Sequence, residues 1–324
     1  MDARILYHAN CFDGCASAAL LGRFLQARLG DRLASIEHVP LQHQAGNAIP
    51  ADAFTAGVNA IVDFRYSPSP RLDWWFDHHR SAFQPASDRA HFEADRSGQR
   101  FWDPTAPSCT GFIARVARER FGFEAPDLAE LVRWADVIDA AAFPSAEVAV
   151  RLDEPALRIM TFLEATRDPA APGKLIEALR TRPLAEVAAE PWVAGPLAPV
   201  LERHFRSIDA VRAAARVEGG VAFLDLAAAG LETGNKFVLY WLFPEARYTV
   251  TVSSDAKRSK VSVGSNPWAR PARAHDISRI CEKYGGGGHP VVGAVSLGPD
   301  RIDEARRVAR EVVATLQSAP EAAA

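Results

Sequence analysis

The chain contains the stretch Trp74-Trp75-Phe76-Asp77-His78-His79-Arg80, an apolar run that ends in a carboxylate and two imidazoles. Successive side chains of a regular strand point to opposite faces, so Asp77, His78 and His79 can converge only where a strand gives way to a loop. Asp and His are suitable ligands for Mn²⁺, Zn²⁺ or Fe²⁺. We therefore expect a buried strand that ends at a metal site. The simpler interpretation is a solvated strand end with two surface histidines.

Two earlier apolar runs also end in residues that bind metals. The range 4–8 is expected to form a first strand ending in His8, and the following loop holds Asp13 before a helix begins. The range 59–64 is expected to form another strand, with Asp63 near its end. In open α/β sheets, ligands bind at the carboxyl ends of the strands. The sequence thus predicts that these residues join the triplet at one edge of a sheet.

A helix expected over 128–142 carries two further acids, Asp136 and Asp139. Because they are three positions apart, they share one face of the helix. Their apolar neighbours indicate that at least one of them points into the protein. We expect Asp136 to join the site, with Asp139 as the alternative, since the sequence does not fix the rotation of the helix. Ser108 is expected to cap the preceding helix, over 109–121.

Together these acids and imidazoles could hold two divalent metals. Such a pair, about 3.5–4 Å apart, clamps the attacking and leaving oxygens of an in-line phosphoryl displacement. Asp63, alone at its strand end, suits the bridging position. One histidine of the triplet can bind a metal while the other contacts the phosphate. Asp77 is expected to orient its neighbour, as carboxylates commonly do for ligating histidines.

The sequence changes character after Gly219, where alternating β-branched residues predict a hairpin over 248–252 and 260–264. A short helix then leads into a run of four glycines followed by His289. Glycines let the backbone approach an anion closely and present its N–H groups, and His289 could reach the same phosphate. Arg258 on the hairpin offers positive charge to a substrate; a solvated hairpin surface is the alternative.

Composition indicates an ordinary globular protein of 324 residues, 48% hydrophobic and 24% charged. Its net charge of −3 means that any nucleic acid must be held by a local patch or by metals. The four cysteines show no CxxC spacing, no signal peptide is visible, and no apolar run approaches the roughly 20 residues of a membrane span. We expect a cytoplasmic protein with reduced thiols and no membrane association.

The length of the chain and the change in residue pattern after Gly219 predict two α/β domains. The first, over 1–185, is expected to be a doubly wound, mainly parallel sheet that binds the metals. A helical linker is expected over 186–217, and a smaller α/β domain that binds substrate over 218–324.

The motifs resemble those of the DHH phosphoesterase superfamily, which is named for the triplet seen here as Asp77-His78-His79. The first motif resembles the range 8–14, the second is Asp63, and the fourth resembles Ala135-Asp136-Val137. The smaller domain looks like the DHH-associated domain, whose mark is the glycine-rich run ending in His289. The resemblance covers nearly the whole chain.

The resemblance implies a phosphoesterase with one or two Mn²⁺ ions in a cleft between the two domains, and it makes a homodimer an expectation. The matching metal ligands are His8, Asp13, Asp63, His78 and Asp136. The residues expected to take part in catalysis are His79, Asp77 and Asp13. The residues expected to bind substrate are Gly286, Gly287, Gly288, His289 and Arg258.

The first motif departs from the family in lacking one of two acids. Depending on the register of the comparison, Cys11 or Cys15 stands where the missing carboxylate would be. A thiolate could still bind a metal, especially a softer one. Alternatively, the site holds its first metal less tightly.

The resulting hypothesis is a Mn²⁺-dependent phosphodiesterase that hydrolyses short single-stranded oligonucleotides or small nucleotides to 5′-mononucleotides. Within the same chemistry, the alternatives are hydrolysis of cyclic nucleotides or dinucleotides, or of 3′-phosphoadenosine 5′-phosphate. A different class, a non-catalytic nucleotide-binding sensor, is favoured only by the missing carboxylate.

Overall fold

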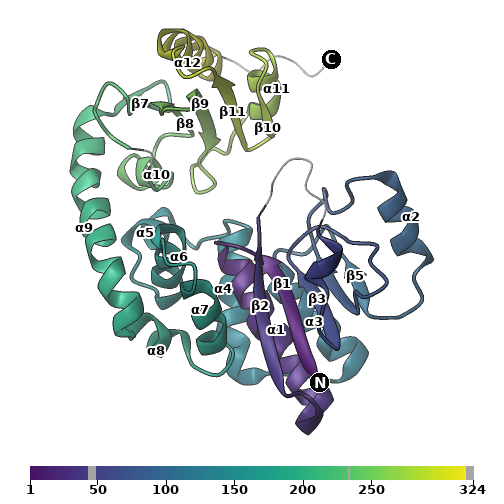
Figure 1. The fold of residues 1–324 in the computed structure, drawn as a ribbon. Helices are drawn as coiled ribbons and strands as arrows, with labels where there is room; N and C mark the ends of the chain where they lie inside the picture. Colours follow the sequence, from purple (N-terminus) through teal and green to yellow (C-terminus); the bar gives the residue numbers. More distant parts are fainter. Residues whose placement is uncertain (43–48, 233, 319–324) are drawn as a thin grey trace. The chain divides into compact units, whose positions relative to one another are not determined.

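The computed structural model describes residues 1–42, 49–232 and 234–318, and the chain divides into two compact units. The first unit comprises Met1–Phe143 and Leu152–Ala198, and the second comprises Pro144–Arg151 and Pro199–Ala324. Helix α9, Pro191–Ala214, contributes residues to both units (Figure 1). It lies within the range for which the sequence predicts a helical linker.

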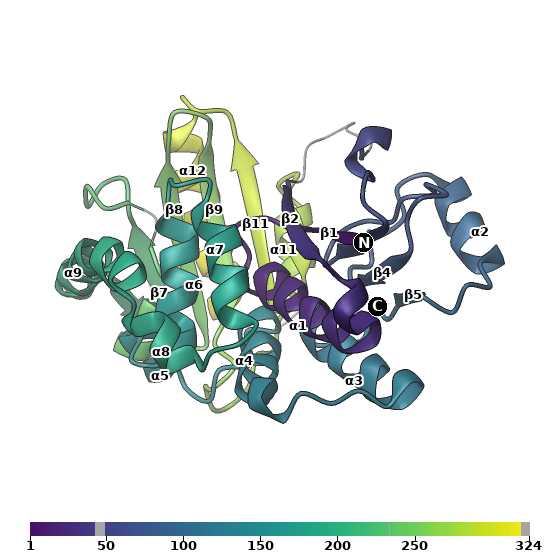
Figure 2. The same ribbon diagram turned by 60° about the horizontal axis from the view of Figure 1, so that its bottom comes forward.

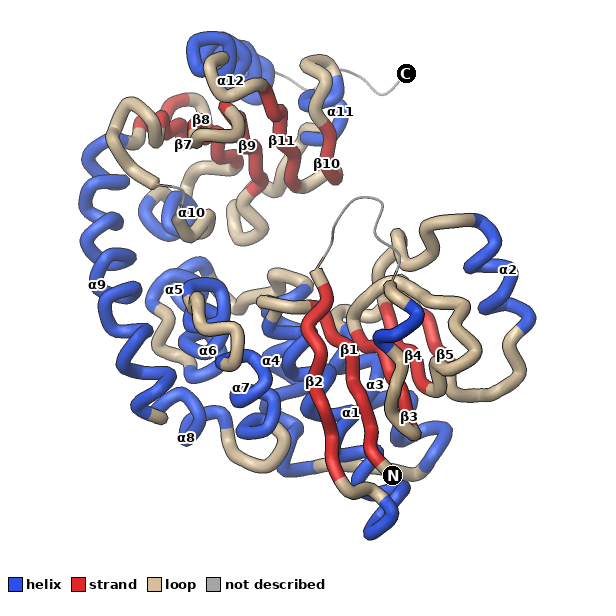
Figure 3. Tube along the Cα trace, in the orientation of Figure 1, coloured by secondary structure: helices blue, strands red, loops and turns tan. Residues whose placement is uncertain are grey.

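The first unit is built on a five-stranded sheet in which every pair of neighbouring strands is parallel (Figure 3). Its strands are β1 Asp2–His8, β2 Ser35–Leu41, β3 Val58–Val62, β4 Trp74–Asp77 and β5 Arg100–Trp102. Their order is β2-β1-β3-β4-β5, so the direction of winding reverses between β1 and β3. Ligands bind at such a switch point in doubly wound sheets. The predicted doubly wound parallel sheet is confirmed.

Apolar side chains cover both faces of this sheet, which explains why its strands read as continuous hydrophobic runs. Helix α1, Phe12–Leu29, packs on β1, and helix α3, Cys109–Phe121, packs on β4 and on α1 (Figure 2). Side chains on the other face of the sheet, including Leu6 and Ile61, pack on Phe54 and Tyr66 of the connecting segments. The remaining α-helices of this unit are α2 Ala86–Ala94, α4 Ala129–Asp139, α6 Pro155–Ala165, α7 Ala171–Leu179 and α8 Leu184–Ala189.

The second unit contains a mixed sheet of six strands in the order β10-β11-β9-β8-β7-β6. The strands are β6 Arg216–Glu218, β7 Val221–Asp225, β8 Tyr248–Ser254, β9 Ser259–Ser265, β10 Gly287–His289 and β11 Val292–Leu297. Only the β7–β8 pairing is parallel among these described strands. The predicted hairpin is confirmed as β8 and β9, and β10 is a strand that the sequence did not indicate.

Helices cover the second sheet on both faces. Helices α11, Ile277–Glu282, and α12, Ile302–Gln317, close a core of valines that includes Val250, Val261 and Val295. On the other face, Leu224 of β7 packs with side chains of α5 Ala146–Arg151, of α9 and of α10 Val238–Leu242. In the described parts of the chain, no helix combines the length and the apolarity that a membrane crossing requires.

The packing of α7 on β2 buries an imidazole, which makes stability sensitive to pH. His38 has a side chain only 5% exposed, and its Nδ1 lies 3.5 Å from Oε1 of Glu177. Burial lowers the pKa of His38 to about 4, an effect that Glu177 opposes and Arg180 reinforces. An unfolded histidine titrates near 6.5, so from about pH 6.5 down to about 4 the unfolded chain binds the additional proton. The free energy of unfolding therefore falls as the pH falls through this range.

We expect the chain to lose about 1–2 kcal/mol more of its unfolding free energy between pH 7 and pH 5 than the His38→Gln variant, whose amide does not titrate. Urea unfolding followed by tryptophan fluorescence at both pH values measures this difference. Other titrating groups are common to both proteins and cancel in the comparison. Equal losses would show that His38 does not contribute to the acid sensitivity.

Candidate metal centre

The carboxyl ends of β1, β3 and β4 bring the predicted metal-binding side chains to one edge of the first sheet. His8 is the last residue of β1, Asp63 follows β3 directly, and Asp77 is the last residue of β4. Because β3 pairs in parallel with both β1 and β4, these three ends are neighbours. His78 and His79 follow Asp77 as the chain turns away from the sheet. The convergence expected from the strand pattern is present in the structure.

Asp63 adopts a left-handed backbone conformation, with φ of +55°, which few residues other than glycine take. Its N–H donates to the carbonyl of Phe76 at 3.0 Å, which holds the turn against β4. The carboxylate thereby lies between two imidazoles. Oδ2 is 3.2 Å from Nδ1 of His8, and Oδ1 is 3.5 Å from Nε2 of His78. This position suits a bridging ligand.

Asp13 is held by the N-terminus of α3, a helix almost 100 residues further along the chain. Its carboxylate accepts hydrogen bonds from the N–H groups of Cys109 at 2.7 Å and Thr110 at 2.9 Å, and from the Thr110 hydroxyl at 2.6 Å. Helix N-termini favour carboxylates. Gly14 is required next to it because a Cβ there would lie 2.2 Å from the carbonyl oxygen of His8. Helix α1 can therefore start directly against the end of β1.

The orientation of His78 is set by the carbonyl of Ala106, which lies 3.0 Å from Nδ1. A carbonyl only accepts hydrogen bonds, so Nδ1 carries the proton of the neutral ring and the lone pair is on Nε2. Nε2 faces three carboxylates, at 3.8 Å from Asp13, 3.5 Å from Asp63 and 3.4 Å from Asp139. Metal-binding histidines are commonly fixed in this way through their other nitrogen.

His79 is held by the first residue of the triplet. Oδ1 of Asp77 lies 2.7 Å from Nδ1 of His79, and it also accepts the N–H groups of His78 at 2.8 Å and His79 at 3.2 Å. This hydrogen bond to Asp77 raises the pKa of His79, against the opposing effect of burial. The side chain of His79 is 35% exposed, compared with 10% for His78. His79 is therefore the imidazole of the triplet that is more accessible to a substrate.

The two acids of α4 lie in different surroundings. Asp136 Oδ1 accepts a hydrogen bond at 2.6 Å from the hydroxyl of Ser108, which in turn accepts the N–H of Gly111 and caps α3 as predicted. A Cβ on Gly111 would lie 2.3 Å from Asp136 Oδ1, so this contact requires glycine. Asp139 lies beside His78 instead. The structure thus brings Asp139, the alternative candidate, into the group of converging side chains and places Asp136 against α3.

Electrostatic repulsion among the clustered acids is the main feature of this site. Burial, together with Asp63 and Asp139, raises the pKa of Asp13 to about 8. Burial also raises the pKa of Asp139, whereas the imidazoles of His78 and His8 overcome burial and lower the pKa of Asp63. Burial opposes the charged form of His78, but Asp63, the Ala106 carbonyl and Asp13 raise its pKa to about 10. A divalent cation would replace these protons as the compensating charge.

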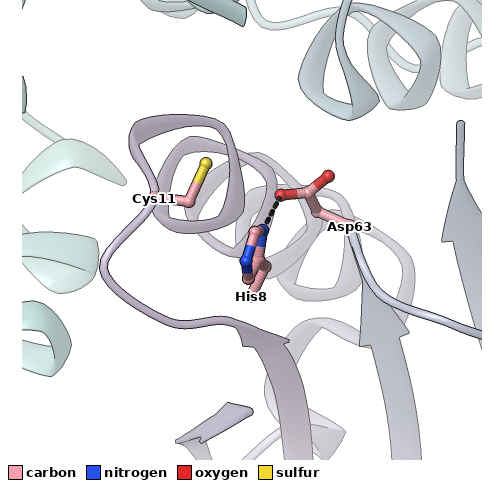
Figure 4. Close-up of side chains that lie close together, drawn as sticks. All are labelled: His8, Cys11 and Asp63. Atoms are coloured by element: carbon pink, nitrogen blue, oxygen red, sulfur yellow. Dashed lines mark hydrogen bonds and ion pairs between the residues drawn. The ribbon is translucent and has the colours of Figure 1, made fainter. Parts of the chain in front are cut away.

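Within the part of the chain that the structure describes, three groups of side chains could each hold a metal ion, with their ligand atoms within 4.8 Å of one another. They are His8 with Cys11 and Asp63, shown in Figure 4; Asp63 with His78 and His79; and Asp13 with His78 and Asp139. Two buried atoms of these groups, Asp63 Oδ1 and His78 Nε2, have no hydrogen-bond partner among the described residues, and neither does Oδ2 of the adjacent Asp77. Buried polar atoms without partners are costly, so the donor set fits a divalent metal.

Two glycines of the glycine-rich run in the second unit are required by the close approach of β10 to β11. A Cβ on Gly286 would lie 2.2 Å from the carbonyl oxygen of Ala294, and one on Gly288 would lie 2.2 Å from that of Val292. Gly288 also has φ of +151°, which other residues rarely adopt. These two glycines allow β10 to pair closely with β11. Gly287, between them, faces open space, where a Cβ would meet no described atom within 4 Å.

The structure does not bring Arg258 and His289 together. His289 is exposed and pairs with Val292 at the start of β11. Arg258 immediately precedes β9, whose first residue, Ser259, pairs with Leu297 at the opposite end of β11. The two side chains therefore belong to opposite ends of the sheet.

Main-chain groups are the part of the site that sequence reasoning missed. The carbonyl of Ala106 and the N–H groups of Cys109 and Thr110 have no residue-type signature. The signal that could have found the N–H groups was the predicted cap at Ser108, because a helix N-terminus attracts carboxylates whatever its side chains.

No protein-family model matches this chain, and no curated protein matches it. Among solved structures, it is similar to the pGpG-specific phosphodiesterase PggH from Vibrio cholerae, with a TM-score of 0.68 and 20% identity over 97% of this chain and 99% of that chain. A second similar structure is RecJ from Thermus thermophilus in complex with Mn²⁺, with a TM-score of 0.49 and 17% identity over 97% of this chain. The match spans 52% of the RecJ chain.

A third similar structure is a DHH domain from a protein described as a member of a family of ribosomal proteins, with a TM-score of 0.45 and 12% identity over 98% of this chain and 87% of that chain. At such identities a likeness concerns the fold. The similarity to PggH extends over nearly the full length of both chains, and it confirms the fold that the motif resemblance implies.

The different surroundings of Asp136 and Asp139 lead to a test with a matched pair of variants. We expect Asp139→Asn to weaken Mn²⁺ binding by roughly tenfold or more, because it removes a charged oxygen beside His78. Asp136→Asn should leave the affinity within about threefold of the parent, since the amide can still accept from Ser108. Isothermal titration calorimetry with Mn²⁺ on the metal-free proteins measures both. The reverse ranking would assign the ligand to Asp136.

Proposed function

We propose that this protein is a divalent-metal-dependent phosphodiesterase that hydrolyses short oligonucleotides, linear dinucleotides above all, to 5′-mononucleotides. The observation that carries this proposal is the orientation of His78. Its Nδ1 is tied to the Ala106 carbonyl, and its Nε2 faces three carboxylates. This nitrogen and Asp63 Oδ1 are both buried and meet no hydrogen-bond partner among the described residues, which a bound metal ion would remedy.

The residues that would hold the metal fall around two positions that share Asp63. His8 and Cys11 flank one side of its carboxylate. His78 flanks the other side, where it forms one group with Asp63 and His79 and another with Asp13 and Asp139. We propose Mn²⁺ as the ion that supports activity. When bound, such ions lower the pKa of a coordinated water and stabilise charge on the phosphoryl oxygens.

The remaining polar groups have roles that follow from their positions. The attack forms a bond from a water oxygen to phosphorus and breaks the bond from phosphorus to the 3′ oxygen, which leaves with a proton. His79 is accessible, and Asp77 favours its protonated form, so it can donate a hydrogen bond to a non-bridging oxygen or the proton to the leaving oxygen. Asp77, fully buried, acts by orienting this ring.

Two considerations support the substrate class that we propose. PggH is named for specificity toward pGpG, which contains two nucleotides and is therefore itself a short oligonucleotide. The net charge of −3 provides no overall positive field for a long nucleic acid. In the second unit, exposed His289 and the open side of Gly287 are the contacts that we propose for a substrate phosphate. Arg258, at the other end of its sheet, is not proposed to contact the same phosphate.

We expect Mn²⁺-dependent release of mononucleotide from pGpG and from RNA of two to five nucleotides, with a 20-mer hydrolysed much more slowly and all activity lost on chelation. His78→Ala should lower kcat/KM by roughly a hundredfold to a thousandfold, as removal of one electrostatic stabiliser does. Asp77→Asn should lower it by about ten- to a hundredfold, the usual effect of losing an orienting carboxylate. Chromatographic separation of labelled products measures these rates.

His91→Ala is the matched control, because His91 is exposed on α2 and lies outside the three metal-binding groups. It should retain the parent rate. If only cyclic di-AMP or 3′-phosphoadenosine 5′-phosphate is hydrolysed, the proposed metal-dependent hydrolysis stands and the proposed substrate is wrong. Full activity of a folded His78→Ala variant would refute the proposed function. Nucleotide binding without turnover would favour a sensor.

A further inference from the structure

Cys11 lies at the point where the first motif lacks a carboxylate, and it faces two of the predicted metal ligands. Its Sγ belongs to a group with His8 and Asp63 whose ligand atoms all lie within 4.8 Å of one another. Figure 4 shows Cys11 at the start of α1, close to His8 and Asp63 at the ends of two neighbouring strands, with the His8–Asp63 interaction marked. Asp63 is 1% exposed, and its Oδ1 has no hydrogen-bond partner among the described residues.

The backbone directs the thiol into this space. Cys11 is the residue that precedes α1, with an extended conformation of φ −114° and ψ 136°, and its carbonyl accepts the N–H of Cys15 as the helix begins. Its side chain is therefore outside the helical repeat, next to the end of β1. The N-terminus of α1, the positive end of an 18-residue helix, favours an anionic group at this place. Burial and the nearby Asp63 and Asp13 raise the pKa of the thiol.

The two metal positions around Asp63 consequently differ in their donor atoms. One offers an imidazole nitrogen, a sulfur and a carboxylate oxygen, from His8, Cys11 and Asp63. The other, where His78 groups with Asp63 and His79 and also with Asp13 and Asp139, offers only nitrogen and oxygen. Thiolates select softer ions such as Zn²⁺, Co²⁺ and Fe²⁺, whereas carboxylates suit Mn²⁺ and Mg²⁺. The difference between the positions therefore depends on a single sulfur atom.

We propose that Cys11 is a thiolate ligand, and that it makes the His8–Cys11–Asp63 position selective for Zn²⁺, Co²⁺ or Fe²⁺ over Mn²⁺. Binding forms a bond from the sulfur to the metal and releases the thiol proton to solvent. The neighbouring position, without sulfur, accepts Mn²⁺. This inference rests on the metal site of the proposed function but concerns which ion each position holds, so it can fail while the phosphodiesterase activity stands.

The first test uses Co²⁺, because a thiolate bound to Co²⁺ gives a near-ultraviolet charge-transfer band that nitrogen and oxygen ligands do not give. Metal-free protein is titrated with Co²⁺ and followed by absorption, for the parent, Cys11→Ser and Cys15→Ala. Cys15 is the matched control, since it is fully buried one helical turn further on and belongs to none of the three groups. The parent and Cys15→Ala should show the band, and Cys11→Ser should lack it.

The second test measures selectivity with Cys11→Asp, which restores an oxygen ligand. Competition of Zn²⁺ with Mn²⁺ should shift toward Mn²⁺ by roughly tenfold relative to the parent, the size expected when a soft donor is exchanged for a hard one. Circular dichroism establishes that the variant is folded. An unchanged ratio, a band that persists in Cys11→Ser, or a parent that binds Co²⁺ without the band would each overturn the proposal.

Hydrolysis of pGpG with Mn²⁺, measured on the same preparations, separates the two proposals. Hydrolysis by a parent protein that shows no charge-transfer band would refute the role of Cys11 and retain the phosphodiesterase. A band that depends on Cys11, in a protein that hydrolyses nothing, would support the thiolate ligand and refute the proposed enzyme.

Discussion

Repulsion among three clustered carboxylates is the constraint on which this site depends. Asp13, Asp63 and Asp139 surround the Nε2 atom of His78, at distances of 3.4 to 3.8 Å. Without metal, the imidazoles supply the compensating positive charge, and the pKa of His78 rises to about 10 as a result. The arrangement is therefore poised for a cation, which would release these protons on binding. Asp63 has a left-handed backbone conformation, which costs some free energy and persists only where the surrounding structure holds it in place.

The N-terminus of helix α3 contacts acids of two other helices, Asp13 of α1 and Asp136 of α4. Its first N–H groups hold Asp13, and its cap residue, Ser108, donates to Asp136 of α4. That contact, with the close approach allowed by Gly111, fixes the rotation of α4 and so determines that Asp139 faces His78. Asp136 therefore contributes to this arrangement through its contacts with Ser108 and Gly111. One helix N-terminus thus arranges acids that are more than 120 residues apart in sequence.

The strand ends were predictable from the sequence, because each is an apolar run that stops at a polar residue. His8, Asp63 and Asp77 are the clearest cases, since parallel neighbours must place such ends at a common edge. The choice between the acids of α4 was not predictable, because it depends on a hydrogen bond to a residue 28 positions earlier. Short strands were also missed. β5 has three residues, and β10 consists of two glycines and His289, so neither offers a periodic pattern.

Asp63 belongs to two of the candidate metal-binding groups, so its carboxylate would be shared if both of them held ions. A carboxylate that bridges two positions transmits the character of each ion to the other, because charge withdrawn by one metal weakens the oxygen offered to its neighbour. If Cys11 binds a metal as a thiolate, its sulfur would donate more electron density than an oxygen, and more of the Asp63 charge would remain for the position beside His78. Replacing one acid by a thiol in the first motif therefore need not empty the site. If ions are held on both sides of Asp63, the thiol would make the two positions unequal in the ions that they accept.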